Sequence, residues 1–570
     1  ISACLVGSEM CIRDSYCKWK YEENEKGKGI ERKETSMKNL FKKIGALLMA
    51  AVMVLSMCTA VFADGQEPTA ADRATITVNN VEAGLTVTAY QITKAKYQAG
   101  KGFRGYEKVN SSYDIADVLA PTADEVAALA KVVAGNGGGV TLTGNGTTYT
   151  ADVAAGYWIV LVTAGANNTK PAKVYNPMLA GVYYSVSGTD KTMTSNPIDA
   201  SQKWSLNGTE GYAKSNEVTV DKTIVNSGSG NNKGDDVAID DEVNYKITST
   251  IPEYSAEYNN DSSNVTYTIN DTLNGLAVKN GSVVVKVGDD VIQAGDDTFA
   301  LQAEGQTVKV AFAKTFILNN GGKNVEVTYT ATLTDDTKVN FDAHTNTVYV
   351  EYSNDPSSNS TARTDEKKTY HYTFAIDGNI NGTKTEHNRK TTELVKVDEN
   401  GKVISTKSKE EIDSNTQTSV ATGATFTLTS TTDSNKVYTA TTDEDGHMTF
   451  KGLDAGTYKL VETVAPEGFT LDTQEHTVVI SATYNDDGTL KSYTIAIDGN
   501  PGSTYTATYN NGTITKIDGT SSTTEIVNTK MGTLPSTGGM GTYLFTIIGV
   551  VVMAVAAGAF FISRRRTSEE

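Results

Sequence analysis

The sequence predicts tandem all-β sandwich domains, and three observations support that fold class. Thr, Val, Tyr and Ile alternate with polar residues through most of the chain, which is the pattern of half-buried strands. Gly, Asn and Asp clusters interrupt these runs, as in strands joined by tight turns. Before the C-terminal region only 123–133 has the spacing of a short helix. Clear examples of alternation are 75–81, 84–92, 324–333 and 504–517.

Two polar, turn-rich stretches divide the middle of the chain. The first, 199–216, leads into an alternating run that begins at Val218. The second, 377–390, leads into another run at Thr391. We therefore expect three immunoglobulin-like domains, with boundaries at about 64–213, 215–376 and 388–531.

The composition excludes several classes of function. The 68 acidic side chains outnumber the 50 basic ones and give a net charge of −18, which argues against a nucleic-acid partner. All four cysteines precede residue 63, so the rest of the chain has no disulfides or thiolate zinc sites. The five histidines have no ligand spacing, and 443–446 departs from the calcium-loop pattern. We expect no metal, no cofactor and no enzyme active site.

The N-terminal region predicts secretion. From Met37, three lysines precede an apolar run at 44–58, and small residues end at Ala63. This is the design of a signal peptide over 37–63, cut after Ala63. Residues 1–36 fit no signal design, and 5–15 resemble translated sequencing adapter, so we expect Met37 to be the start and 1–36 to be a non-native or mis-annotated leader.

The C-terminal region predicts a surface anchor. Leu534-Pro535-Ser536-Thr537-Gly538 precedes an apolar run at 543–562 and an arginine-rich tail at 563–570. Twenty apolar residues span a bilayer, and the arginines place the tail in the cytoplasm. A simple single-pass anchor would explain the helix alone. The order of the three parts resembles the LPxTG sorting signal of Gram-positive wall proteins, which implies cleavage between Thr537 and Gly538 by a sortase and attachment to peptidoglycan.

Three polar residues of the second domain fall on apolar strand faces. Because alternate strand residues share a face, Lys222 lies with the apolar residues of 217–225, Asp271 with those of 265–273 and Asn354 with those of 347–354. The third domain repeats the set with Lys396, Glu462 and Asn528. If these strand ends lie in loops, the six side chains are simply solvated.

If buried, these side chains have a specific chemistry. Burial favours the neutral forms of Lys, Asp and Glu. A neutral amine is a nucleophile, and a protonated carboxyl can polarise a carboxamide by hydrogen bonding. The three groups together can therefore join lysine to asparagine as an amide, with loss of ammonia.

The third domain resembles a known family. Its 458–469 stretch, YKLVETVAPEGF, matches the E-box of Gram-positive pilins and Cna-B-type domains except at Phe469. The stretches 394–401, 423–428 and 525–530 resemble the lysine, second and asparagine strands of that family. The resemblance implies an autocatalytic Lys396–Asn528 isopeptide bond promoted by Glu462.

The other two domains are less similar to the family. The second domain resembles the Cna-A-like middle domain of backbone pilins, which implies a Lys222–Asn354 bond promoted by Asp271. The strand at 154–162 of the first domain resembles the E-box strand, but Leu161 stands where the glutamate would be. We therefore expect no crosslink in the first domain.

A lysine near the end of the first domain resembles the second sortase substrate of backbone pilins. In that family a YPKN-like motif follows a tryptophan, and here Trp204 precedes Tyr212-Ala213-Lys214-Ser215. The match is partial, and a solvated linker lysine is the plain alternative. The resemblance implies that Lys214 of one subunit attacks the acyl-enzyme at Thr537 of another.

The whole pattern predicts the backbone subunit of a sortase-assembled pilus. Its partners would be sortases, other pilin subunits, peptidoglycan and a host or matrix ligand. The alternatives are a monomeric wall-anchored adhesin or a minor basal pilin, in which Lys214 has no role. An anchored secreted enzyme is disfavoured because the sequence has no GxSxG, phosphate loop or catalytic carboxylate pair.

Overall fold

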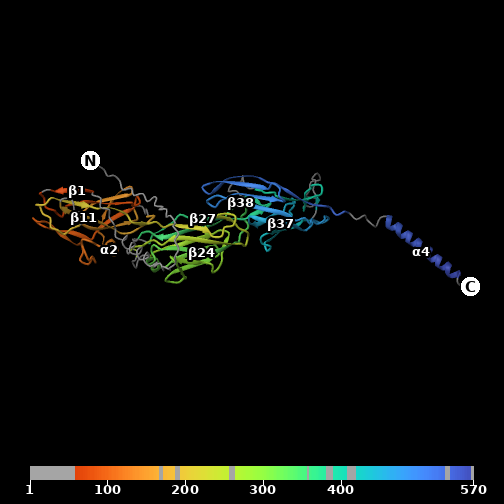
Figure 1. Cartoon of the computed structure of the whole chain (residues 1–570), viewed down its shortest axis with the longest axis horizontal. Coiled ribbons are helices and arrows are strands. Elements are labelled where there is room, and N and C mark those ends of the chain that lie inside the picture. Colours follow the sequence, from red (N-terminus) through yellow and green to blue (C-terminus); the bar gives the residue numbers. More distant parts are fainter. Residues whose placement is uncertain are drawn as a thin grey trace, which may run out of the picture. The chain divides into compact units, whose positions relative to one another are not determined.

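The computed structural model describes 58–63, 65–165, 171–186, 193–255, 258, 264–355, 359–380, 389–406, 419–420, 422–532 and 540–566. The leader, most of the signal peptide and the sorting motif 534–538 lie outside these residues. Strands dominate, and the all-β prediction is confirmed (Figure 1). Residues at the end of the predicted signal peptide form β1 (Cys58–Ala63), which pairs with β12 (Trp204–Gly208).

The first domain is built from two sheets around one core. One sheet has the order β1-β12-β11-β9-β3-β6, and the other β13-β2-β8-β7. Ile76, Val87, Tyr149 and Val160 bring both sheets into a single hydrophobic cluster. The remaining strands are β2 (Ala74–Asn79), β3 (Thr86–Gln91), β4 (Thr93–Gln98), β5 (Gly102–Lys108), β6 (Val140–Thr141), β7 (Thr143–Asn145), β8 (Thr148–Val153), β9 (Gly156–Thr163), β10 (Val174–Tyr175), β11 (Met178–Val186), β13 (Glu210–Tyr212) and β14 (Ser215–Asn216).

The predicted short helix is α2 (Ala123–Asn136). Thr122 and Glu125 form a capping box that satisfies free N–H groups of the first turn. The helix runs past Gly135 and ends at Gly137, whose φ of 68° is left-handed. Glycine lowers helix stability by only about 1 kcal/mol, so the helix continues through Gly135, beyond the predicted end at 133.

The second domain is a sandwich of two larger sheets. One has the order β15-β17-β24-β20-β21, and the other β16-β27-β25-β18-β23-β22. Buried and partly exposed residues alternate along β17, along β24 and along β25 as far as Tyr352, so each of these strands turns one apolar face to the core. The elements are β15 (Val220–Ile224), β16 (Gly234–Asp236), β17 (Glu242–Thr250), β18 (Tyr267–Leu273), β19 (Leu276–Val278), β20 (Val284–Val287), β21 (Asp290–Ile292), β22 (Phe299–Glu304), β23 (Thr307–Phe312), α3 (Lys314–Asn319), β24 (Asn324–Leu333), β25 (His344–Ser353), β26 (Thr361–Arg363) and β27 (Lys367–Tyr372).

The third domain has one seven-stranded sheet, β35-β34-β37-β38-β39-β40-β41, and several two-stranded pairs. In one of these pairs β31 and β42 are parallel, so the beginning and the end of the domain lie together. The elements are β28 (Phe374–Ile376), β29 (Asn379–Ile380), β30 (Arg389–Lys390), β31 (Leu394–Asp398), β32 (Ile404–Ser405), β33 (Ser419–Val420), β34 (Thr425–Ser430), β35 (Val437–Thr441), β36 (Phe450–Leu453), β37 (Gly456–Val464), β38 (His476–Tyr484), β39 (Leu490–Ile497), β40 (Ser503–Asn510), β41 (Thr513–Thr520) and β42 (Thr524–Asn528).

The structure moves one expected domain boundary. We expected the second domain to end at 376, but β28 pairs with β36, and Phe374 belongs to the third hydrophobic cluster. The polar stretch that suggested the boundary begins at Asp377, which has a φ of 52°. That stretch therefore begins with a turn inside the third packing unit.

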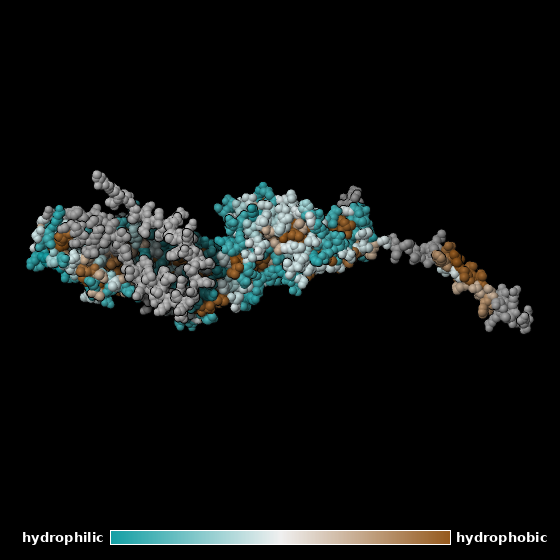
Figure 2. All heavy atoms as spheres, in the orientation of Figure 1, coloured by the Kyte–Doolittle hydropathy of each residue, from teal (hydrophilic) through white to brown (hydrophobic). Residues whose placement is uncertain are grey.

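The C-terminal apolar run forms α4 (Met540–Arg566), in agreement with the predicted membrane helix. Its segment Leu544–Phe561 has a mean hydropathy of 2.5, and none of it is buried. Figure 2 shows hydrophobic colouring along this helix. An exposed apolar helix of this length is suited to cross a bilayer.

Candidate functional site: two buried lysine–acid–amide clusters

The first cluster lies between the two sheets of the second domain. Lys222 on β15 is 1% exposed, and its Nζ lies 2.5 Å from Oδ2 of Asp271 on β18, which is also 1% exposed. The same Nζ donates to the hydroxyl of Tyr329 on β24, 3.0 Å away. The rings of Tyr245 and Tyr329 flank the amine, at 4.8 Å and 5.3 Å from their centroids. The sequence prediction that Lys222 and Asp271 both point into the core is confirmed.

The surroundings favour the neutral forms of both groups. Burial lowers the pKa of Lys222 to about 8, although the neighbouring Asp271 carboxylate opposes this shift. Burial likewise raises the pKa of Asp271, against the effect of the Lys222 ammonium. A neutral amine beside a protonated carboxyl is the pair that amide formation requires.

The amide in this cluster belongs to Asn346 rather than to Asn354. Asn346 on β25 is fully buried, and its Nδ2 donates to the Tyr329 hydroxyl at 2.6 Å. That hydroxyl also contacts Lys222 Nζ and Asp271 Oδ2. One hydroxyl therefore connects the amine, the acid and the amide of Asn346.

Asn354 lies elsewhere, so the expected Lys222–Asn354 pairing is corrected. Its Nδ2 donates to the Pro171 carbonyl, and its Oδ1 accepts from Ser360. Asp271 is opposite Val348 in the β18–β25 ladder, six residues before Asn354. Six strand residues span about 20 Å, which is too far for the Lys222 amine that contacts Asp271.

Strand alternation in the sequence places Asn346 on the buried face, but it gives no reason to prefer Asn346 over Asn354. Asn346 and Asn354 are both an even number of residues from Val348, so both fall on the buried face. Alternation repeats every two residues and says nothing about position along a strand. Only the strand pairing, which places Asn346 opposite Leu273 and close to Asp271, separates the two asparagines.

The second cluster lies in the third domain and contains all three predicted residues. Lys396 Nζ is 3.2 Å from Glu462 Oε1, and both side chains are buried. Asn528 Nδ2 donates to Glu462 Oε2 at 2.8 Å. The parallel pairing of β31 with β42 carries Lys396 and Asn528 to Glu462 on β37. Burial lowers the pKa of Lys396, although Glu462 opposes the shift.

The two clusters share a pattern of buried oxygens without hydrogen-bond partners. In the second domain these are Asp271 Oδ1 and Asn346 Oδ1, and in the third Glu462 Oε1 and Asn528 Oδ1. Two acceptors cannot satisfy each other, and a buried acceptor without a donor is costly. Burial raises the pKa of Asp271, and a proton on this carboxyl would supply the donor that the Asn346 oxygen lacks.

The first domain has no such cluster among its described residues. Leu161 is buried on β9 at the position that a catalytic acid would occupy. The buried polar side chains there are uncharged: Thr93, Ser185, Ser205, Asn207 and Thr209. The expectation of no crosslink in this domain stays a prediction.

The predicted sortase lysine lies in an exposed linker. Lys214 stands between β13 and β14, with its side chain half exposed and its Nζ 3.9 Å from Glu253 Oε2. An exposed ion pair of this length contributes little, so the amine is accessible. The partner motif at 534–538 lies outside the described residues.

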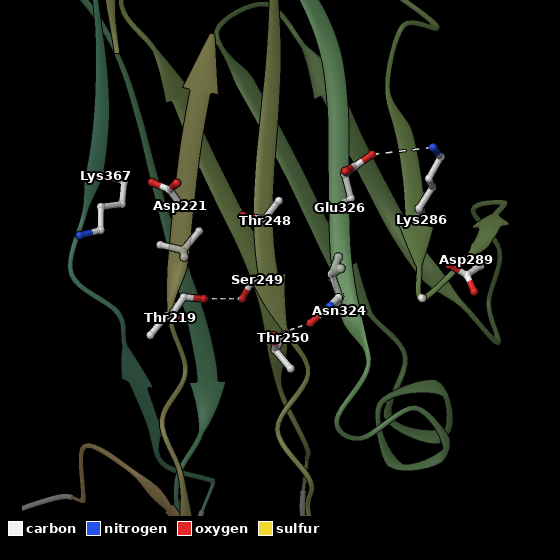
Figure 3. A pocket seen from close by; sticks show the side chains of 13 residues that line it. Thr219, Asp221, Thr248, Ser249, Thr250, Lys286, Asp289, Asn324, Glu326 and Lys367 are labelled. Atoms are coloured by element: carbon white, nitrogen blue, oxygen red, sulfur yellow. Dashed lines mark hydrogen bonds and ion pairs between the residues drawn. The ribbon is translucent and has the colours of Figure 1, made fainter. Parts of the chain in front are cut away.

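A pocket on the outer face of the second domain has a different character. It measures about 830 Å³ and crosses β15, β17, β20 and β24. Figure 3 shows Lys286 paired with Glu326, and Thr250 bonded to Asn324. Its labelled polar groups mostly bond to one another, and we assign it no chemistry.

Three family models match separate parts of the chain. A T6 antigen Ig-like domain matches 71–215. A SpaA-type prealbumin-like fold domain matches 401–495, which includes Glu462. An LPXTG cell wall anchor motif matches 526–569. The matches support the sandwich fold and the wall anchor, so the protein is a cell-wall-anchored surface protein.

A similar sequence and a similar solved structure extend the likeness to most of the chain. The trypsin-resistant surface T6 protein of Streptococcus pyogenes serotype M6 is 25% identical over 558 residues, which cover 87% of this chain and 95% of that protein. The predicted resemblance to backbone pilins is confirmed. The structure of the T6 backbone pilin of serotype M6, a modular three-domain protein, matches with a TM-score of 0.53 and 19% identity, covering 82% of this chain and all of that one.

Proposed function

We propose that this chain is the shaft subunit of a covalently polymerised, wall-anchored pilus. The observation that carries the proposal is the end-to-end likeness to the T6 protein together with the anchor motif. The chain acts as a sortase substrate and as its own crosslinking agent, and it turns over no external substrate. Its partners are sortases, further copies of the chain and peptidoglycan.

Polymerisation joins two sites of different subunits. A sortase cysteine attacks the Thr537 carbonyl, the Thr537–Gly538 bond breaks, and the segment with α4 leaves carrying the free amine of Gly538. The Lys214 amine of another subunit then attacks the acyl-enzyme. An amide forms, and the sortase thiol leaves with the lysine proton. The exposed position of Lys214 supports this role.

Replacing the acyl donor tests the proposal. Thr537→Ala is expected to abolish both detergent-resistant ladders and wall-bound protein, because the variant lacks the threonine side chain of the LPxTG motif that the sortase cleaves. Immunoblots of wall and membrane fractions from the native host measure this. Ser536→Ala is the matched control, since an LPxTG motif accepts different residues at that position. Unchanged ladders in Thr537→Ala would contradict the proposal.

Within each subunit we propose two isopeptide bonds, Lys222–Asn346 and Lys396–Asn528. Each lysine nitrogen attacks the asparagine Cγ, and the acid donates its proton to the carboxamide oxygen. The acid next carries a proton from the lysine nitrogen to Nδ2, the Cγ–Nδ2 bond breaks, ammonia leaves, and the oxygen returns its proton to the acid. The short distances and shared burial in both clusters support this chemistry.

The third-domain acid provides a direct test. Glu462→Ala is expected to stop the Lys396–Asn528 bond, because no other carboxyl contacts both groups in the part of the chain that the structure describes. The intact mass of the soluble domains should then show one ammonia loss instead of two. Glu467→Ala is the control, since this exposed residue lies five positions away in the same motif. Two losses in Glu462→Ala would contradict the role of Glu462.

A further inference from the structure

We propose that the Tyr329 hydroxyl is a catalytic proton relay in the second-domain crosslink. The inference rests on the proposed Lys222–Asn346 bond and adds a fourth participant to it. Tyr329 is fixed in the middle of β24, where the β17–β24 ladder places it opposite Tyr245. The two rings stack at 5.0 Å between centroids, which holds the hydroxyl in place.

The hydrogen bonds of Tyr329 connect the two reacting nitrogens. The hydroxyl donates to Asp271 Oδ2 at 2.5 Å and accepts from Lys222 Nζ at 3.0 Å and from Asn346 Nδ2 at 2.6 Å. A phenol has one proton and two lone pairs, so these three bonds use its full capacity. The oxygen therefore contacts the nucleophile, the acid and the leaving group at once.

The length of the acid explains why this cluster needs a relay. In the third domain Glu462 contacts Lys396 with one oxygen and Asn528 Nδ2 with the other. Asp271 is one methylene shorter, and its bonds go to Lys222 and Tyr329 instead. Asn346 Nδ2 meets the tyrosine hydroxyl, which occupies the place that the second glutamate oxygen fills in the other cluster.

The relay balances the protons of the reaction. Asp271 gives its proton to the Asn346 oxygen as the Lys222 nitrogen bonds to Cγ, and it then takes a proton from that nitrogen. Tyr329 passes its own proton to Asn346 Nδ2 and receives the one held by Asp271. Ammonia leaves with the electron pair of the broken Cγ–Nδ2 bond, and the remaining oxygen-bound proton returns to Asp271. Tyr329 and Asp271 end as they began.

The test compares both crosslinks in one molecule. The full chain is harvested at intervals after a short pulse of synthesis, and peptide mass mapping follows the two crosslinked peptides. Tyr329→Phe is expected to slow the Lys222–Asn346 bond by about 100-fold or more, the usual contribution of a positioned acid–base group. The Lys396–Asn528 bond should form at its normal rate and so report a folded chain.

Tyr267→Phe is the matched control. Tyr267 is equally buried in the same domain, but its hydroxyl donates to Ser249 and contacts none of the reacting groups. Both bonds should form normally in this variant. If Tyr329→Phe fails to fold, difluorotyrosine at position 329 keeps the ring and makes the hydroxyl more acidic, and the rate of the Lys222–Asn346 bond should change.

The outcomes separate the two claims. A wild-type rate for the Lys222–Asn346 bond in Tyr329→Phe, or no rate change with difluorotyrosine, would overturn the relay and leave the crosslink intact. Absence of the Lys222–Asn346 peptide from the wild-type chain would overturn the proposed crosslink itself.

Discussion

Asn346→Ala is expected to leave the mature chain with one ammonia loss instead of two, whereas Asn354→Ala keeps both. Asn346 is the buried amide that reaches Lys222 and Asp271 through Tyr329. Asn354 bonds to Pro171 and Ser360 instead. Intact-mass measurement of the soluble domains, compared with the mass of each sequence, counts the losses directly. The two variants remove the same side chain from the same buried face, so each controls for the other.

The expected loss of stability is large. By analogy with a disulfide that closes a loop of more than 100 residues, the bond contributes about 5 kcal/mol through chain entropy. The second domain of Asn346→Ala should therefore unfold at lower denaturant concentration, while the third domain keeps its midpoint. Full ammonia loss in Asn346→Ala, or a missing loss in Asn354→Ala, would reverse the assignment.

Lys214→Ala is expected to abolish pilus ladders while wall-bound monomer remains. The anchor motif can still be cleaved at Thr537 and passed to peptidoglycan, but no subunit offers the amine that extends the fibre. Immunoblots of wall extracts from the native host measure both products. The expected change is complete loss of every band above the monomer.

A second lysine of the same region provides the control for this result. Lys203 is exposed and lies just before Trp204, eleven residues from Lys214. Lys203→Ala removes one positive charge from the first domain but leaves the linker unchanged, so its ladders should be normal. Ladders that persist in Lys214→Ala would mean that another lysine is the nucleophile. Absence of ladders from the wild-type chain would favour the adhesin or basal-pilin alternative.

The two crosslinks would carry tension differently. Lys396 and Asn528 lie on β31 and β42, the parallel strands near the two ends of the third domain, so that bond bypasses most of its fold. The proposed bond of the second domain would not join its first strand to its last. Asn346 lies on β25, and β26 and β27 follow it in the chain. A Lys222–Asn346 bond would tie the two sheets of the sandwich together and leave the later strands outside the closed loop.

The third-domain cluster could be predicted completely, whereas the second could not. Lys396, Glu462 and Asn528 each stand in a family motif, so resemblance and alternation both select them. The second domain has no comparable motif around its asparagine. Alternation alone makes Asn346 and Asn354 equivalent, and nothing local marks Tyr329 as different from the other inward-facing residues of β24.

The sequence by itself determined the strand-rich fold, the wall anchor and which faces of the strands are buried. These properties depend on residues close together in the chain, where a period of two or a run of apolar residues is directly visible. The tertiary structure decided which asparagine shares a hydrogen-bond partner with Lys222, and that this partner is the hydroxyl of Tyr329. Those contacts join β15, β18, β24 and β25, and their register depends on pairing between distant segments, which no local pattern contains.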